Sequence, residues 1–327
     1  MKRLFISFSG GETSGFMTQW LLKNRAQDYD EIQVVFANTG QEREETLDFI
    51  ERCSKHFGFP TTWVEAVVHH GERRAPTHRV VDFSNASRNG EPFEEAITKY
   101  GIPNQAFPGC TRDIKLCPMK SYLRSVGWEN GSYDTAIGIR NDERNRVRKK
   151  AMVEERIVYP LVYDLPMSKP DVNEFWRRQP FRLQLKGYEG NCKWCWKKSL
   201  RKHLTLASEN PSYYDFPKQI EEKYGLVGPE FNKEGMQERV AGGYRRTFFR
   251  QGLSAKDILR MAQEEEFTSA EDDADKYPDY STGEGYELDM VFSGCSEHCE
   301  VFHTDEELEA DGMEVDMDKL DALLGDR

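Results

Sequence analysis

The chain begins with a short apolar run, Leu4 to Phe8, which stops at a stretch rich in glycine and hydroxyl residues. Apolar residues then recur at helical spacing, at Phe16, Met17, Trp20 and Leu21. This change of hydrophobic period predicts a strand, a tight loop over residues 9–14 and a helix that starts after Ser14.

The same succession of patterns returns further along the chain. The apolar run Ile32–Ala37 ends in Asn38-Thr39-Gly40, and helical spacing follows from Leu47 to Phe57. Residues 61–68 and 135–139 are two further strand candidates, whereas a long loop and a helix are expected between Val68 and Asn104. Strands that alternate with helices predict an α/β fold with a doubly wound, mostly parallel sheet and helices on both faces.

Three polar loops follow predicted strands, at residues 9–14, 38–40 and 140–144. Ligands of doubly wound sheets bind outside the carboxyl ends of the strands. We therefore expect these loops to converge on one crevice.

Composition divides the chain unevenly. Residues 264–327 hold 23 acidic and three basic side chains, and the remainder has an excess of eight basic ones. We therefore expect a nucleotide-binding domain over residues 1–205, a helical region over 206–266 and an acidic tail over 267–327. No apolar run reaches the roughly 18 residues that span a bilayer, so a cytoplasmic protein without membrane contact is expected, its cysteines reduced or metal-bound.

The loop Ser9–Ser14 has the chemistry of an anion site. Glycines let a phosphate approach the backbone, and the start of a helix offers unpaired N–H groups and a positive dipole end. The residues fit neither GxGxxG nor GxxxxGK[ST]. An ordinary glycine turn between strand and helix is the alternative.

The segment "SGGETSG" resembles the SGGxxS phosphate loop of the PP-loop ATP pyrophosphatases, and several later segments resemble their phosphoadenylylsulfate-reductase-like branch. Those segments are "VVFANTGQEREETLDFI", "ASRNGEPFEEAI", "GCTRDIKLCPM", "AIGIRNDERNR", "QPFRLQL" and "GNCKWCWKKS", so that the similarity covers residues 4–205. The resemblance implies a Rossmann-like adenine-nucleotide α-hydrolase fold that binds ATP and Mg²⁺.

The resemblance also implies roles for individual residues. The β,γ-phosphates of ATP would be held by Ser9, Gly10, Gly11, Glu12, Thr13 and Ser14. Asn38 and Thr39 would lie near the nucleoside, and Arg140 beside the phosphates. Ser9, Ser14 and Arg140 would be the catalytic residues, because they would stabilise the pyrophosphate that leaves.

Four cysteines form two pairs, Cys110-x6-Cys117 and Cys192-x2-Cys195. Their spacing allows tetrahedral zinc or an iron–sulfur cluster and does not choose between them. The resemblance favours a [4Fe-4S] cluster, with zinc or a static metal staple as alternatives and Cys117 as the most doubtful ligand. Cys295 and Cys299 could bind zinc, relay a persulfide or have no role, whereas Cys53 falls on an apolar helix face and is expected in the core.

Basic and aromatic residues gather in "RNDERNRVRKK", "KWCWKKSLRKH" and "YRRTFF". This composition is typical of nucleic-acid contact, although the tryptophans could also pack around a metal. Resemblance to the Dnd and Ssp sulfur-insertion proteins then suggests ATP-dependent sulfur transfer in DNA phosphorothioation, with DNA and a cysteine desulfurase as partners. The alternatives are a reductase of adenylylated sulfate, a tRNA thiolation enzyme and a non-catalytic nucleotide-binding adaptor.

Overall fold

The computed structural model describes residues 1–227 and 244–272, so Cys295, Cys299 and most of the acidic tail lie outside the described residues. Its centre is a six-stranded sheet in the order β4-β3-β2-β1-β5-β6. The strands are β1 (Arg3–Ser7), β2 (Glu31–Asn38), β3 (Thr61–Val67), β4 (Thr77–Val81), β5 (Asp134–Ala136) and β6 (Ile157–Val158). All neighbours pair in parallel except β3 and β4. The predicted doubly wound α/β fold is confirmed.

Three local predictions were wrong. The edge strand β4 was expected as loop, because its residues are mostly polar and partly exposed and so carry no apolar alternation. β5 ends at Ala136 rather than Ile139. The first helix, α1 (Glu12–Asn24), begins two residues before Ser14, and therefore includes part of the expected loop.

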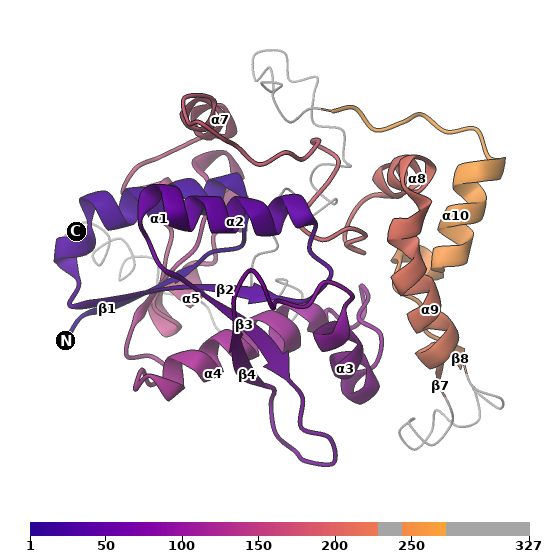
Figure 1. Cartoon of the computed structure of the whole chain (residues 1–327), viewed down its shortest axis with the longest axis horizontal. Helices are drawn as coiled ribbons and strands as arrows, with labels where there is room; N and C mark the ends of the chain where they lie inside the picture. Colours follow the sequence, from indigo (N-terminus) through magenta and orange to yellow (C-terminus); the bar gives the residue numbers. More distant parts are fainter. Residues whose placement is uncertain (228–243, 273–327) are drawn as a thin grey trace.

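Helices cover both faces of the sheet (Figure 1). α1, α2 (Glu44–Phe57) and α7 (Lys169–Arg177) lie on one face, where Leu4 and Ile6 of β1 join their apolar core. Phe5 points to the opposite face and packs with α4 (Cys117–Ser125). This alternation is the two-residue period of a strand that is buried on both sides.

The helices α8 (Leu200–Glu209), α9 (Asp215–Tyr224) and α10 (Ala255–Glu264) stand together beside the sheet (Figure 1). Their buried side chains form one cluster with α3 (Glu91–Tyr100), Trp194 and Phe248. The predicted helical region thus packs against residues of the nucleotide-binding segment. The remaining elements are η1 (Ala26–Asp28), η2 (Cys110–Leu116), η3 (Asn141–Arg146), α5 (Lys149–Glu154), α6 (Pro160–Tyr163), η4 (Pro211–Tyr214), β7 (Leu226–Val227), β8 (Tyr244–Arg245) and η7 (Arg250–Gly252).

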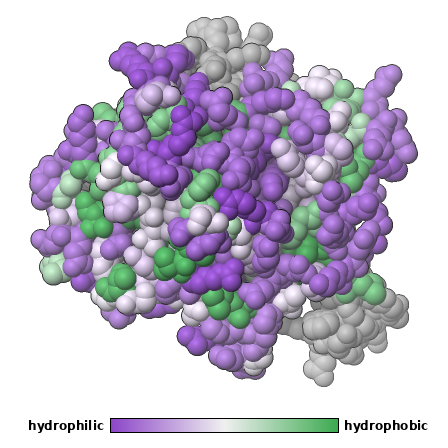
Figure 2. Space-filling model, in the orientation of Figure 1, coloured by the Kyte–Doolittle hydropathy of each residue, from purple (hydrophilic) through white to green (hydrophobic). Residues whose placement is uncertain are grey.

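Hydrophilic residues cover most of the face seen in Figure 2, and the hydrophobic ones form small separate groups. Within the described ranges, none of the helices combines the length and the apolar character needed to cross a bilayer.

Candidate nucleotide-binding site

The loop after β1 presents the start of α1 at the carboxyl end of the sheet. Gly11 is the N-cap, with extended backbone angles (φ −95°, ψ 161°), and no side chain caps the helix. The first N–H groups of a helix have no partner within it, so those of the first turn of α1 can bind an anion. Because α1 begins at Glu12, these N–H groups belong to the very residues that the motif predicts as phosphate ligands.

The backbone conformation and the surroundings of Gly10 explain why the loop has a glycine at this position. Its φ of +83° lies in the left-handed region, and a Cβ there would stand 2.8 Å from Ile50 Cδ1 and 2.8 Å from Thr46 Cγ2. The loop therefore lies directly against α2, and a side chain at residue 10 would be strained and would clash.

The hydroxyl groups of the loop converge. The Oγ atoms of Ser9 and Ser14 are 2.9 Å apart, and Ser14 also donates to the Gly11 carbonyl at 3.0 Å. The structure thus brings together the two serines that were predicted as catalytic, although they lie on opposite sides of the two glycines.

The loop after β5 reaches the same place. Arg140 Nη1 donates to Thr13 Oγ1 at 3.1 Å, and a Cβ on Gly138 would lie 3.3 Å from Ser14 Cα. β1 and β5 flank the point where the strand order reverses, which is where doubly wound sheets bind ligands. Arg140 is buried, and Asp142 at 3.0 Å and Glu143 at 3.4 Å balance its charge.

The side chain of Glu12 is held by another part of the chain. Its carboxylate accepts two hydrogen bonds from Arg182, at 3.0 and 3.1 Å, and a third from the Leu183 backbone at 3.2 Å. Its carbonyl accepts from Trp176 Nε1 at 2.9 Å. Since the carboxylate is already engaged, the predicted role of Glu12 in phosphate binding depends on its backbone N–H.

Asn38 and Thr39 lie at the end of β2, the neighbour of β1. Asn38 Nδ2 donates to Glu65 Oε1 at 2.6 Å and to the Ser87 carbonyl at 2.9 Å. The backbone N–H and the hydroxyl of Thr39 both donate to Glu42 Oε2 at 2.8 Å. Both residues are fully buried and held by these hydrogen bonds, and their place near the nucleoside stays a prediction.

The segment 189–196 ties the first two loops together. Asn191 Nδ2 donates to the Ser9 carbonyl at 2.8 Å, and the Asn191 carbonyl accepts from the Arg43 backbone N–H at 2.8 Å. Cys192 pairs with Glu42 in an isolated antiparallel bridge, and their Sγ and Oε1 atoms are 3.7 Å apart. Cys192 is therefore brought close to the loop that carries Thr39.

The four predicted metal ligands come from two segments. Cys110 and Cys195 are buried, and Cys117 and Cys192 are partly buried. Burial, together with the negative charge of Asp113, raises the pKa of the Cys117 thiol. Among the residues described, no three His, Cys, Asp or Glu side chains stand close enough together to hold a metal ion. The [4Fe-4S] cluster and the zinc alternative therefore stay predictions.

Cys53 is a different case, because the prediction for it can be compared directly with the structure. Cys53 stands on the buried face of α2 and is fully buried in the core, as expected.

The basic segments are less available than their composition indicates. Past Arg140, Arg146 pairs with Glu143 at 2.6 Å, and Arg148 and Lys150 pair with Glu155 and Glu154 at 3.8 and 4.0 Å. The tryptophans and phenylalanines of the other two segments, Trp194, Trp196, Phe248 and Phe249, are buried. These four rings pack in the protein and cannot stack on bases.

Comparison with known proteins identifies the family. The model of the phosphoadenosine phosphosulfate reductase domain matches residues 3–177. The chain belongs to this family. Its nucleotide-binding fold is therefore that of a PP-loop enzyme family, as the motif in the loop after β1 indicated.

Relatives of this phosphoadenosine phosphosulfate reductase family member occur in a phage and an archaeon. The nin region protein ORF290 of Escherichia phage lambda is 29% identical over 91% of this chain and 94% of its own length. MJ0066 of Methanocaldococcus jannaschii is 29% identical over 51% of this chain, and MJ0973 of the same organism is 30% identical over 36%. These matches cover 29% and 22% of the two archaeal proteins.

The sequence did not single out five residues that hold the loops of the nucleotide-binding site in position. They are Glu42, Arg43, Lys115, Arg182 and Asn191. Arg43 pairs with Glu189 at 2.9 Å, and Lys115 pairs with Glu42 at 3.4 Å, all four side chains being less than 10% exposed. All five lie in segments that resemble the family, but that resemblance gave none of them an individual role.

Proposed function

We propose that the chain is an ATP pyrophosphatase that adenylates an oxygen of a nucleic-acid group and directs sulfur to that position. The observation that carries the proposal is the meeting of the Ser9–Ser14 loop with Arg140 at the strand-order switch point. DNA phosphorothioation is the specific reaction proposed, and this choice rests on the motif resemblance.

The first step needs only groups of this site. The acceptor oxygen attacks the α-phosphorus of ATP, the bond from that phosphorus to the α,β-bridging oxygen breaks, and pyrophosphate leaves. The N–H groups of the first turn of α1 and the hydroxyls of Ser9 and Ser14 would bind the departing pyrophosphate. Arg140 would stabilise its charge and orient Thr13.

The second step replaces the activated oxygen. The terminal sulfur of a persulfide, supplied by a cysteine desulfurase, attacks the adenylated centre, and the bond to the oxygen that leaves with AMP breaks. A thiol reductant then cleaves the sulfur–sulfur bond, which leaves one sulfur atom on the acceptor and a disulfide on the donor side. Adenylation is needed because an unactivated oxygen is a poor leaving group.

Mg²⁺ would share the charge of the triphosphate when it is bound. The described residues contain no cluster of three carboxylates that would hold the ion alone, so the proposal assigns it no protein ligand.

Pyrophosphate release tests the proposal. The protein is incubated anaerobically with ATP, Mg²⁺, a persulfide donor and DNA, and pyrophosphate is measured together with sulfur in the DNA. Ser14→Ala should lower the rate about 100-fold, since one transition-state donor is worth 10²–10³. Ser125→Ala is the matched control, because that exposed hydroxyl stands at the end of α4, where it donates to the Tyr122 carbonyl and lies 3.5 Å from His78 Nε2. Absence of DNA-dependent pyrophosphate release would refute the proposal.

The family assignment itself favours one other candidate, a reductase of adenylylated sulfate. That reaction needs a presented nucleophilic thiol. Cys295 and Cys299, the candidates for it, lie outside the described residues. Thiol-dependent release of sulfite from adenylylated sulfate, abolished by Cys295→Ser or Cys299→Ser, would support this alternative.

A further inference from the structure

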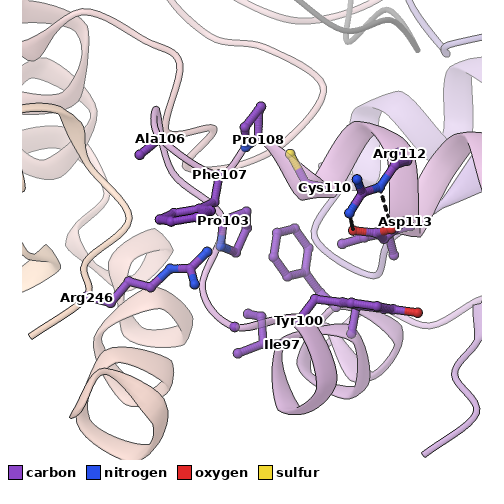
Figure 3. A pocket seen from close by; sticks show the side chains of 15 residues that line it. Ile97, Tyr100, Pro103, Ala106, Phe107, Pro108, Cys110, Arg112, Asp113 and Arg246 are labelled. Atoms are coloured by element: carbon purple, nitrogen blue, oxygen red, sulfur yellow. Dashed lines mark hydrogen bonds and ion pairs between the residues drawn. The ribbon is translucent and has the colours of Figure 1, made fainter. Parts of the chain in front are cut away.

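Phe107, Asp113 and Arg246 are among the residues that line a cavity of about 190 Å³ (Figure 3). Its walls are α3, the loop 101–109, the segment η2 and Arg246. η2 also carries Lys115, which pairs at 3.4 Å with Glu42, the residue that accepts both hydrogen bonds from Thr39. The cavity is thus separate from the Ser9–Ser14 loop but shares a wall with the nucleotide end of the site.

One end of the cavity is a flat stacking surface. The guanidinium of Arg246 lies 4.1 Å from the centroid of the Phe107 ring, and the two side chains lie side by side in Figure 3. Phe107 is 52% exposed, so part of its ring is open to a ligand. An aromatic ring and a guanidinium plane are the two kinds of surface on which bases stack.

The other end of the cavity is polar. The Asp113 carboxylate is buried, and Arg112 holds it with hydrogen bonds of 2.9 and 3.2 Å from Nε and Nη2. A carboxylate offers about four lone-pair sites, so it can accept further hydrogen bonds. η2 has a π-helical turn at this point, a rare conformation that is often found at functional sites.

We infer that this cavity binds one nucleobase of the acceptor strand, unstacked from its neighbours. A base has a π-face for Phe107 and N–H groups on its edge for Asp113. The volume is below the roughly 300 Å³ of ordinary small-molecule sites, so it suits a single ring system. An aliphatic side chain of a protein partner would displace water from the Asp113 carboxylate without replacing the hydrogen bonds of that water. Binding of such a side chain in the cavity is therefore disfavoured.

Cationic residues around the opening also favour a nucleic acid. Arg112 lines the cavity and is exposed, although it also pairs with Asp113. The Arg74 carbonyl accepts from Lys99 Nζ at 2.8 Å, which places this second exposed arginine at the carboxyl end of α3. Arginines in this position can bind the phosphates on either side of an inserted base.

The inference rests on the proposed function only in taking DNA as the acceptor, so binding is measured without ATP. The probe is a fluorescently labelled single-stranded DNA 12-mer with one central 2-aminopurine, and the reference is the same strand with an abasic site there. Phe107→Ala should weaken binding of the intact strand about 5- to 150-fold, the equivalent of 1–3 kcal/mol for one stacked base. Phe107→Trp should retain binding and quench 2-aminopurine fluorescence.

Two controls complete the design. Val153 on α5 is 53% exposed, close to the 52% of Phe107, and Val153→Ala should leave binding unchanged. The abasic strand should bind equally to the parent protein and to Phe107→Ala. The inference would be overturned if Phe107→Ala lost affinity equally for both strands or lost none for either. It would also be overturned if this variant lost binding to a cysteine desulfurase while its DNA binding stayed unchanged. A strand that binds through Phe107 without any pyrophosphate release would instead refute only the proposed function.

Discussion

Asn191 donates its side-chain amide to the carbonyl of Ser9 at 2.8 Å, although 182 residues separate the two in sequence. Ser9 begins the phosphate loop, and Asn191 precedes Cys192 in a segment that also pairs with the loop after β2. A single buried side chain therefore connects the phosphate loop to the cysteine segment. The shape of the loop depends on this distant contact as well as on its own glycines.

The first prediction concerns this contact. Asn191→Ala should weaken ATP binding about tenfold, because loss of a buried hydrogen bond costs roughly 1–2 kcal/mol and frees the Ser9 carbonyl to move. Isothermal titration with ATP measures the effect. Asn24→Ala is the control, since Asn24 also donates one amide hydrogen bond to a backbone carbonyl, but at the exposed far end of α1. Equal ATP affinity in both variants would contradict the role of Asn191.

The second prediction separates backbone strain from steric contact at Gly10. Gly10 and Gly58 have similar positive φ angles, +83° and +71°, but a Cβ on Gly58 would meet nothing within 4 Å. Gly58→Ala should cost about 1 kcal/mol for its left-handed backbone alone. Gly10→Ala should cost about 2 kcal/mol more, because the added methyl would press against Ile50 and Thr46. Urea unfolding of the two variants measures this difference, and similar midpoints would contradict the close packing of the loop.

Much of the fold could be predicted because its signals are local. Leu4, Phe5 and Ile6 are all buried because both faces of the sheet are covered, and such strands appear in sequence as continuous apolar runs. The edge strand β4 escaped prediction for the opposite reason. Its neighbours bury only part of its surface, so its sequence keeps no periodic apolar pattern.

The site was predictable only in part. Ser9 and Ser14 lie in one short motif, and their proximity follows from the loop that joins strand and helix. Arg182 and Asn191 contact this motif from far along the chain, and the family-like segments that contain them do not show which residues they contact. The sequence left open whether Trp194 packs inside the protein or contacts a nucleic acid, because a tryptophan between lysines occurs in both places, and the structure shows that it is buried.

The third prediction is a pH dependence that arises at Glu221. Burial raises the pKa of this carboxyl to about 7, although its two oxygens accept hydrogen bonds from the backbone of Phe248 and Ala255. The folded protein therefore holds a proton that the unfolded chain releases near pH 4.5. The free energy of unfolding should fall by about 3 kcal/mol as the pH rises from 4.5 to 7, and change little from this source outside that range.

A pair of variants isolates this effect. Glu221→Gln removes the titrating group, so its urea midpoint should fall less than that of the parent between pH 5 and 7.5. Glu222→Gln changes the next residue, which is exposed and has its pKa lowered chiefly by a hydrogen bond to Lys256. This control should follow the parent, and identical pH slopes in all three proteins would exclude Glu221 as the source.

The last prediction concerns the ion pair that holds Glu12. Arg182→Ala should lower the free energy of unfolding by about 3 kcal/mol, because the Glu12 carboxylate is 6% exposed and would stay buried without its main counter-charge. It should also weaken ATP binding, since that uncompensated charge would stand at the start of α1, where the phosphates are expected. Adding Glu12→Gln to Arg182→Ala should restore part of both losses, whereas a merely local packing defect would not be relieved by removing a charge.

Arg178→Ala is the control. It removes an arginine that is 75% exposed and pairs with Glu174, and it should leave the free energy of unfolding and ATP binding nearly unchanged. Urea unfolding and ATP titration of these three variants and the parent protein therefore show whether the phosphate loop needs the charge of Glu12 to be neutralised or needs Arg182 only as a packing contact.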